Sequence, residues 1–397
     1  MPTVKGQKIN TFFILEYALC GAIILATLLQ KTALASAAFT VSFVALVIYF
    51  VKLSVFDGAR HFLIITLLIA GISLLSLSFS SLLNKRLLTV NYLKEYFIFL
   101  STLFFMFIAA NEKINTKTAK TILVFNVFIA YLYPIAYRFF PQKNTYNILS
   151  LNFSNPNLTA MWIMQSVFYA VLAVILIDSK IIKIIAAVSV PLNAFLINET
   201  GARNTILALV LFAVLCVLVA LKREKSFSKP LMLIINIIPI AFVPIYLSCI
   251  DFVQKSGWFD FLVEEGKKLT SRFGIWEEKF EKIKGLWLMG NYAESSGNAH
   301  NSHLVLLSSY GIAVLILMIY FLYKLCAQVN DEAEDKKNLF ALAAFFAVIF
   351  MGLGEGALFS GGQGIFIMAC GFLLLARCDY CGSEDEEEKN LVEQAVG

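Results

Sequence analysis

The sequence has few charged residues for its length. Only 15% of its 397 residues are charged, whereas 59% are hydrophobic, and the mean hydropathy is +0.78. Soluble domains carry roughly 25% charged residues. This composition therefore excludes a soluble globular fold for most of the chain.

Three sequence features that would indicate other kinds of protein are missing. The first apolar run, residues 11–30, lacks a small-residue cleavage site, so we expect a retained membrane span and no cleavable signal peptide. The chain shows no internal repeat, which argues against transporters built from duplicated halves. It also lacks a glycine-rich phosphate loop, so we expect no nucleotide cofactor.

The seven cysteines offer no pair placed for an extracytoplasmic disulfide. Five of them fall within or at the ends of apolar runs. Cys378 and Cys381 form a Cys-x-x-Cys motif beside an acidic tail, which is compatible with a metal or redox site. Because no second pair accompanies them, we expect this motif to be incidental.

Apolar runs long enough to cross a bilayer account for most of the chain. A hydrocarbon core of ~30 Å needs about 20 helical residues. The sequence therefore predicts an all-α, polytopic membrane protein with about twelve transmembrane helices. The predicted spans are residues 11–30, 33–53, 61–82, 94–111, 119–140, 156–177, 181–198, 204–221, 231–250, 302–326, 338–353 and 362–377.

The basic residues of the short connecting segments predict the orientation of these spans. They gather on the side that holds both termini, and basic loops stay in the cytoplasm. We therefore expect cytoplasmic termini and four parts of the chain. These parts are spans 1–9 in residues 1–250, an extracytoplasmic loop in 251–301, spans 10–12 in 302–377 and an acidic cytoplasmic tail in 378–397.

The extracytoplasmic loop contains one amphipathic segment. Phe273, Trp276, Phe280, Ile283 and Trp287 recur at helical spacing and predict one apolar helix face. Charged residues between positions 277 and 284, Lys279 among them, are expected to fill the other face. Such a helix would lie on the membrane surface or on the mouth of the bundle, although it is also compatible with simple packing on the bundle.

Three polar residues on the predicted outer face are candidates for chemistry. Arg203 lies between the seventh and eighth spans, Arg272 begins the amphipathic segment, and His300 precedes the tenth span. Gly201 allows a close backbone approach beside Arg203. Two guanidiniums near helix starts, with one imidazole, suit a lipid substrate that carries a diphosphate.

Each of these candidate residues also has a purely structural interpretation. Arg203 is compatible with a snorkelling anchor at the membrane boundary, and Arg272 with a weak surface ion pair to a nearby glutamate. His300 and His303 have the spacing of two zinc ligands, but no nearby carboxylate or cysteine completes a site. We therefore expect no metal.

Four short motifs, in order, resemble the O-antigen ligase and O-antigen polymerase superfamily of bacterial membrane glycosyltransferases. They are residues 153–160 (FSNPNLTA), 200–205 (TGARNT), 271–276 (SRFGIW), and 300–304 (HNSHL) followed by 310–312 (YGI). The resemblance covers roughly residues 150–377. The second motif has Ala202 where the family usually has serine.

The resemblance implies a metal-independent, inverting glycosyltransferase that needs no cofactor. Arg203 and Arg272 would hold the diphosphate of an undecaprenyl-diphosphate-linked oligosaccharide, and His300 would act on the acceptor hydroxyl. The site would face outward from the bacterial cytoplasmic membrane. Further candidate site residues are Asn301, His303, Glu199, Asn155, Asn157, Trp276 and Glu355, the last with an expected arginine partner.

Several functions stay open at this stage. A polymerase joins lipid-linked repeat units into O-antigen or capsular polysaccharide, whereas a ligase transfers finished glycan to lipid A–core or another acceptor. We favour the polymerase because that role also exists without an outer membrane. Besides the lipid bilayer and the glycan substrates, a flippase and a chain-length regulator are candidate partners; no nucleic acid is expected.

Two hypotheses from other functional classes, a transporter and a structural scaffold, remain. A small-anion transporter usually carries ionisable residues near the middle of its spans, whereas here polarity gathers at one face. A structural scaffold would not need a long outer loop with arginines and histidines.

Overall fold

A computed structural model describes most of the chain as helices. It covers residues 9–56, 60–85, 89–139, 148–153, 155–221, 226–256, 270–292, 299–333, 336–356, 358–359 and 365–378. The side chains of residues 90–91, 250–256 and 270–273 are outside this description. Within it, no β-strand occurs, which confirms the predicted all-α class.

The helices follow one another through short connections. Their bounds are α1 Thr11–Leu28, α2 Thr32–Phe56, α3 Arg60–Leu83, α4 Val90–Asn111, α5 Thr116–Phe139, α6 Pro156–Leu176, α7 Lys180–Glu199, α8 Arg203–Leu221, α9 Lys229–Ser256, α11 Thr270–Lys282, α13 Ser302–Asp331, α14 Lys336–Met351 and α15 Ile365–Ala376.

Ten of the described helices, α1 to α9 and α13, are long and apolar enough to cross a membrane. The chain is therefore a multi-pass membrane protein. Helices α14 and α15 are shorter, with 16 and 12 residues. The predicted total of about twelve spans consequently stays a prediction.

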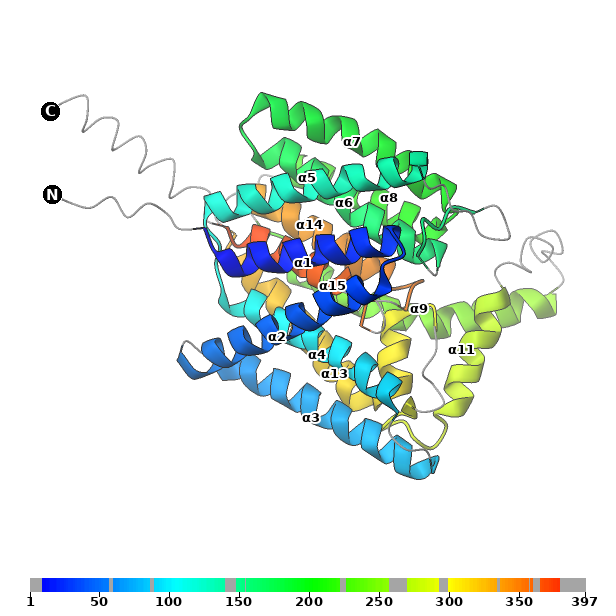
Figure 1. The fold of residues 1–397 in the computed structure, drawn as a ribbon. Helices are drawn as coiled ribbons and strands as arrows, with labels where there is room; N and C mark the ends of the chain where they lie inside the picture. Colours follow the sequence, from blue (N-terminus) through cyan, green and yellow to red (C-terminus); the bar gives the residue numbers. More distant parts are fainter. Residues whose placement is uncertain are drawn as a thin grey trace, which may run out of the picture.

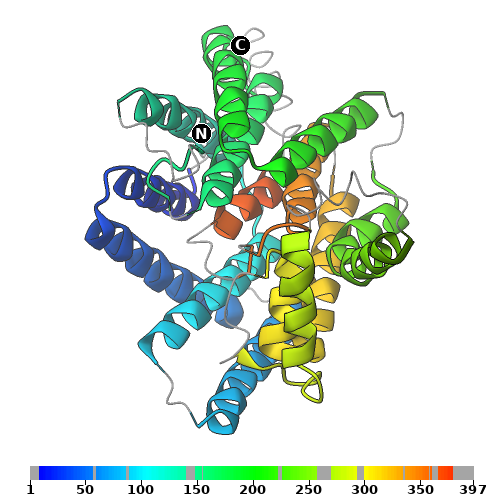
Figure 2. The same ribbon diagram turned by 90° about the vertical axis from the view of Figure 1, so that its right-hand side faces the viewer.

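The bundle has a buried centre and an apolar periphery. Every residue of α15 is buried, and Figure 2 shows the orange and red segments, α14 and α15, at the centre of the bundle. By contrast, α2, α7 and α8 expose large apolar side chains, such as Ile48, Ile181 and Val210. Apolar side chains on the periphery are what a lipid solvent permits, because hydrocarbon tails are as apolar as leucine.

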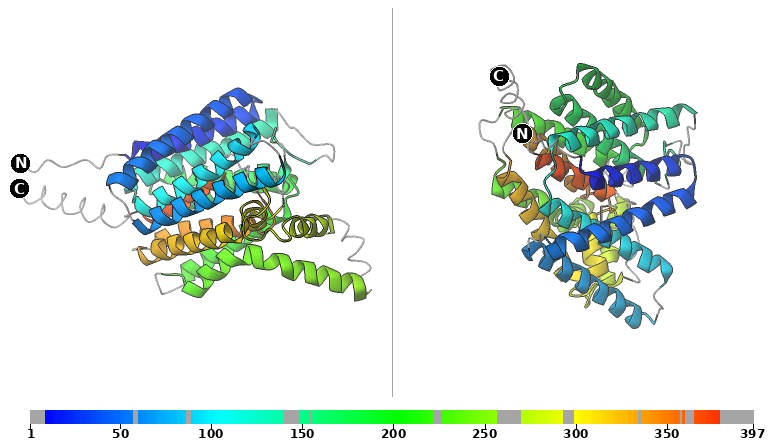
Figure 3. Two further views of the ribbon diagram at one scale, coloured as in Figure 1. Left: turned by 90° about the horizontal axis from the view of Figure 1, so that it is seen from below. Right: turned by 60° about the vertical axis from the view of Figure 1, so that its left-hand side comes forward.

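The described chain begins and ends at the same end of the bundle (Figure 1). There, the backbone N–H of Asn10 donates to Thr118 Oγ1 over 2.8 Å, and Arg377 donates to the carbonyl of Ala109 and to Glu332. Helix α11 lies at the opposite end, which we call the loop end. Figure 3 shows the helices running between these two ends from two further directions.

The described residues between α14 and α15, 352–356 and 358–359, enter the bundle without helical structure. Glu355, Leu358 and Phe359 are all buried, and Gln165, in the middle of α6, donates to the carbonyl of Ile365 over 3.1 Å. Helix α15 therefore begins at the level of the middle of α6. Non-helical backbone at membrane depth is stable only where protein surrounds it, and this segment meets that condition.

Helix α13 contains a break that receives part of the loop. Gly311 has φ +85°, and Ile312 N–H donates to the carbonyl of Trp287 over 2.8 Å. Asn291 N–H donates to the carbonyl of Ser308. A Cβ atom on Gly311 would lie 2.1 Å from the carbonyl oxygen of Leu288, so only glycine allows this approach.

Candidate functional site

Arg203 projects from a tight turn at the loop end. Helix α7 ends at Glu199, Thr200 caps it, and Gly201 adopts φ +63°, a left-handed conformation common after helix ends. The hydroxyl of Thr200 accepts the N–H of Ala202 and donates to the carbonyl of Ile197. The turn thus positions Arg203 as the first residue of α8.

The guanidinium of Arg203 is available for a ligand. Its side chain is exposed, and no hydrogen bond or ion pair in the described part of the chain involves it. The next two residues carry buried polar atoms, Asn204 Nδ2 and Thr205 Oγ1, that have no hydrogen-bond partner among the described residues. Buried polar groups normally have partners, and the start of a helix favours anions.

His300 lies beside a buried carboxylate at the same end. Its Nδ1 is 3.9 Å from Glu355 Oε2, and the His300 and Glu355 side chains are 25% and 5% exposed. His300 has φ +47°, a conformation that is uncommon outside glycine but more tolerated by histidine than by most residues. The imidazole is therefore accessible on one side and faces a carboxylate on the other.

Asn301 and Ser302 fasten the segment that carries Glu355. Asn301 caps α13 by accepting the N–H of Leu304, and its Nδ2 donates to the carbonyls of Pro239 and Leu353. Ser302 N–H donates to the carbonyl of Gly352, and Ser302 Oγ donates to the carbonyl of Glu355. These bonds hold the backbone of the segment against α13, so Asn301 has a structural role.

His303 is wholly buried in the first turn of α13. Neither ring nitrogen has a side-chain or backbone partner that meets hydrogen-bond geometry among the described residues, and the ring packs edge-on against Phe359 at 5.6 Å. Asn236, also wholly buried, likewise has no partner for Oδ1 in that part of the chain. His303 thus packs behind the segment that carries Glu355 and does not reach the surface.

Asn155 and Asn157 shape the start of α6. Asn155 is its N-cap and accepts the N–H of Asn157 over 2.9 Å, with Pro156 at the first helical position. In the preceding segment, Leu149 N–H donates to the carbonyl of Glu199 over 3.2 Å. The asparagine motif therefore acts on the backbone and lies close to the turn that carries Arg203.

Trp276 anchors α11 to the bundle. Its ring is buried against Phe242 and Tyr246 of α9, and Nε1 donates to the carbonyl of Ala299 over 2.6 Å. Because Ala299 precedes His300 directly, Trp276 helps to fix the backbone that carries the imidazole.

The predicted amphipathic pattern of α11 is correct in part. Ile283 is buried as expected, but Trp287 lies beyond the end of the helix and is 42% exposed. Lys279, expected on the charged face, is instead buried, because α11 rests on the bundle over a wider face than the aromatic stripe indicates. That burial lowers the pKa of its ammonium group.

The structure brings some of the predicted site residues together and separates others. It pairs His300 with Glu355, for which the sequence had suggested an arginine partner. It places Arg203 and Glu199 at the same end, at the junction of α7 and α8. The side chain of Arg272 lies outside the described residues, so its role in binding diphosphate stays a prediction.

Sequence reasoning missed a buried carboxylate and the segment after α14. Glu16, in α1, is wholly buried and accepts a hydrogen bond from Ser42 of α2. The sequence feature that could have identified Glu16 is an acidic residue within an apolar run. The largely buried position of residues 352–356 and 358–359 had only a weak signal in the sequence, the glycines at 352, 354 and 356.

The described residues contain no group of three or more His, Cys, Asp or Glu side chains arranged to hold a metal ion. Comparison with known proteins gives no family: no protein-family model matches the chain, and no curated protein matches it significantly.

Proposed function

We propose that the chain is a membrane glycosyltransferase that polymerises lipid-linked repeat units of a bacterial surface polysaccharide. The proposal rests on the ordered motifs described above. The structural observation that supports it most is the position of His300, partly exposed beside the buried carboxylate of Glu355. Arg203, an exposed cation in its own motif, lies at the same end of the bundle.

The proposed donor is an oligosaccharide linked to undecaprenyl diphosphate. Arg203 and Arg272 would bind its diphosphate, because arginine holds phosphate oxygens in a bidentate manner and stays charged. Fixed cations stabilise the negative charge that develops on a leaving diphosphate. The reaction would then need no metal.

His300 would act as the general base in this scheme. The acceptor hydroxyl loses its proton to the imidazole while its oxygen attacks the anomeric carbon, and the bond from that carbon to the diphosphate oxygen breaks. Attack opposite the leaving group inverts the anomeric configuration. The carboxylate of Glu355 lies 3.9 Å from Nδ1, so Glu355 would act as a positioning residue that orients the imidazole.

Glycan profiling in a strain that lacks this gene tests the proposal. The strain is complemented at matched expression with wild type or with Arg203→Ala, Arg272→Ala or His300→Ala. Arg138→Ala is the control, because Arg138 is an exposed arginine at the end of α5 and outside all four motifs. We expect single repeat units in the null strain and in the three site variants, and a ladder with wild type and Arg138→Ala.

Other glycan patterns would indicate a different function. Long glycan that stays on its lipid carrier in the null strain would identify a ligase with the same chemistry. An unchanged glycan pattern would rule out both enzymes and turn attention to anion transport.

A further inference from the structure

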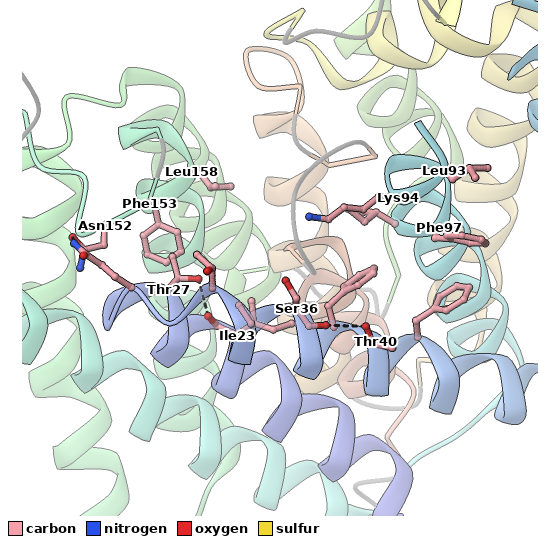
Figure 4. Close-up of a pocket in the computed structure, with 16 residues that line it drawn as sticks. Ile23, Thr27, Ser36, Thr40, Leu93, Lys94, Phe97, Asn152, Phe153 and Leu158 are labelled. Carbon is pink, nitrogen blue, oxygen red and sulfur yellow. Dashed lines mark hydrogen bonds between the residues drawn. The ribbon is translucent and has the colours of Figure 1, made fainter. Parts of the chain in front are cut away.

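A pocket of about 840 Å³ opens between the N-terminal helices and the start of α6. Its volume lies within the range of about 300–1,000 Å³ typical of small-molecule sites. Residues from α1, α2, α4, α6 and the segment before α6 line it (Figure 4). None of them belongs to the motifs proposed for catalysis except Phe153 and Leu158.

The lining is mostly apolar and partly aromatic. Phe39 and Phe43 of α2, Phe97 of α4 and Phe153 contribute rings, and Ile23 contributes an aliphatic wall. The stretch of α2 that lines the pocket, from Thr32 to Phe43, is about 16 Å long at 1.5 Å per residue, which is roughly half the hydrocarbon thickness of a bilayer. These dimensions suit a hydrocarbon chain.

The pocket is open to the surroundings of the bundle. Ser36, Thr40 and Phe97 line it and are also exposed. The exposed ring of Phe97 forms an apolar part of this opening, and apolar side chains on the periphery of a membrane protein face lipid, so a lipid chain can enter sideways.

One cation lies at this pocket. Lys94 is exposed, and within the described residues it takes part in no hydrogen bond or ion pair. Figure 4 shows its side chain extending from α4 toward the wall that carries Phe153. Lys120 and Lys282, in contrast, pair with carboxylates at 2.6 Å. An unpaired ammonium beside an apolar pocket is complementary to a lipid phosphate.

The rim of the pocket connects to the turn that carries Arg203. Asn152 lines the pocket, accepts from Gln30 Nε2 over 3.1 Å and donates to the carbonyl of Leu28. In the same segment, Leu149 N–H bonds to the carbonyl of Glu199, four residues before Arg203. A lipid held in the pocket would therefore present its headgroup at the same end of the bundle as Arg203.

We propose that this pocket holds the part of the donor's polyprenyl chain nearest its diphosphate and that Lys94 binds an oxygen of that diphosphate. The inference rests on the proposed function, because that function supplies a lipid whose hydrocarbon chain and phosphates match the pocket and the cation. Lys94 is then a lipid-binding residue separate from the groups assigned to the glycosyl transfer.

Binding of undecaprenyl diphosphate to the full-length protein in nanodiscs tests the inference. Lys94→Ala should raise the Kd about tenfold, as expected for one lost charge-assisted hydrogen bond. Lys31→Ala is the matched control, because Lys31 is exposed in the α1–α2 turn and does not line the pocket. Ala35→Trp, which fills the pocket, should weaken binding further, whereas Ala33→Trp on the exposed side of α2 should not.

Arg203→Ala, measured in the same assay, separates this inference from the proposed function. If it weakens binding while Lys94→Ala and Ala35→Trp bind as wild type does, the pocket is not the lipid site and the proposed function stands. If wild type does not bind the probe at all, both fail. Equal competition by dioleoylphosphatidylglycerol would also overturn the inference, because the pocket would then be a general phospholipid site.

Discussion

At the scale of single residues, the site separates into groups that are free to bind a ligand and groups that hold the backbone. Arg203 belongs to the first kind, whereas His300 is partly exposed and lies beside Glu355. Asn301, Asn155 and Trp276 belong to the second, because their polar atoms bind backbone groups. A motif in the sequence combines both kinds, and only hydrogen-bond partners distinguish them.

Arg203→Lys should lose most of the transfer activity, and Arg203→Ala nearly all of it. A lysine keeps the charge but not the bidentate fork that matches diphosphate oxygens. We expect Arg203→Lys to lower kcat/KM by roughly tenfold to a hundredfold, which corresponds to the loss of about one charge-assisted hydrogen bond. Full activity of Arg203→Lys would mean that only charge is needed, and full activity of Arg203→Ala would end the diphosphate role.

Glu355→Gln should lower kcat with little change in the donor KM. The substitution keeps the shape of the side chain but removes the charge that faces His300 at 3.9 Å. General-base catalysis by a positioned group typically accelerates a reaction 10²–10⁴-fold. We expect Glu355→Gln to lower kcat by less than this full factor, because His300 itself is kept. Steady-state kinetics check this, and an equal rise in KM would assign Glu355 to substrate binding.

Chelators should leave the transfer rate unchanged, because arginines, not a metal ion, are proposed to stabilise the negative charge of the leaving diphosphate. The assay is repeated after incubation with EDTA and dialysis. A loss of activity that added Mg²⁺ or Mn²⁺ restores would contradict this.

At the scale of elements, the sequence predicted the long helices well and the breaks poorly. Apolar runs set the helices because each must satisfy its own backbone in lipid. The position of residues 352–356 and 358–359 depends instead on distant partners, which are the side chain of Asn301 and both polar groups of Ser302. No local pattern encodes such partners, so this position could not be predicted from the sequence.

Gly311→Ala should destabilise the protein. Its Cβ would meet the carbonyl of Leu288 at 2.1 Å, and φ +85° is strained for alanine. Forcing an extra methyl group into a packed site costs typically about 1–3 kcal/mol. Gly71→Ala is the control, because a Cβ atom there meets nothing within 4 Å. Thermal unfolding in detergent checks this; equal Tm values for both variants would contradict the close approach.

Asn301→Ala should destabilise the loop end more than a matched substitution elsewhere. It removes the cap of α13 and leaves the carbonyls of Pro239 and Leu353 without that donor. Each buried group left unpaired costs about 1–3 kcal/mol. Asn126→Ala loses only a bond within its own helix. A normal Tm combined with lost activity would instead place Asn301 in the catalytic machinery.

At the scale of the whole molecule, Arg203, His300 and Glu355 lie at one end of an apolar bundle. The charge distribution predicts that this end faces outward, while the fold alone does not orient the bundle. The sequence thus predicted the all-α membrane class, whereas the roles of the candidate site residues stay predictions. It did not reveal the Lys94 pocket, because the pocket's walls come from distant parts of the chain.

The orientation predicts which cysteines a membrane-impermeant maleimide reaches in intact spheroplasts. In a Cys249→Ser background, Glu278→Cys on exposed α11 should be labelled, and Lys120→Cys at the opposite end should not. Labelling of Lys120→Cys alone would reverse the topology.

The most direct test of the central claim is transfer by the purified protein. The protein in nanodiscs is supplied with repeat units linked to undecaprenyl diphosphate, and the products are separated by size. We predict oligomers of the repeat unit with wild type and none with His300→Ala or Arg203→Ala. If wild type leaves the repeat units unjoined while remaining folded and able to bind the lipid, the protein is not the polymerase proposed here.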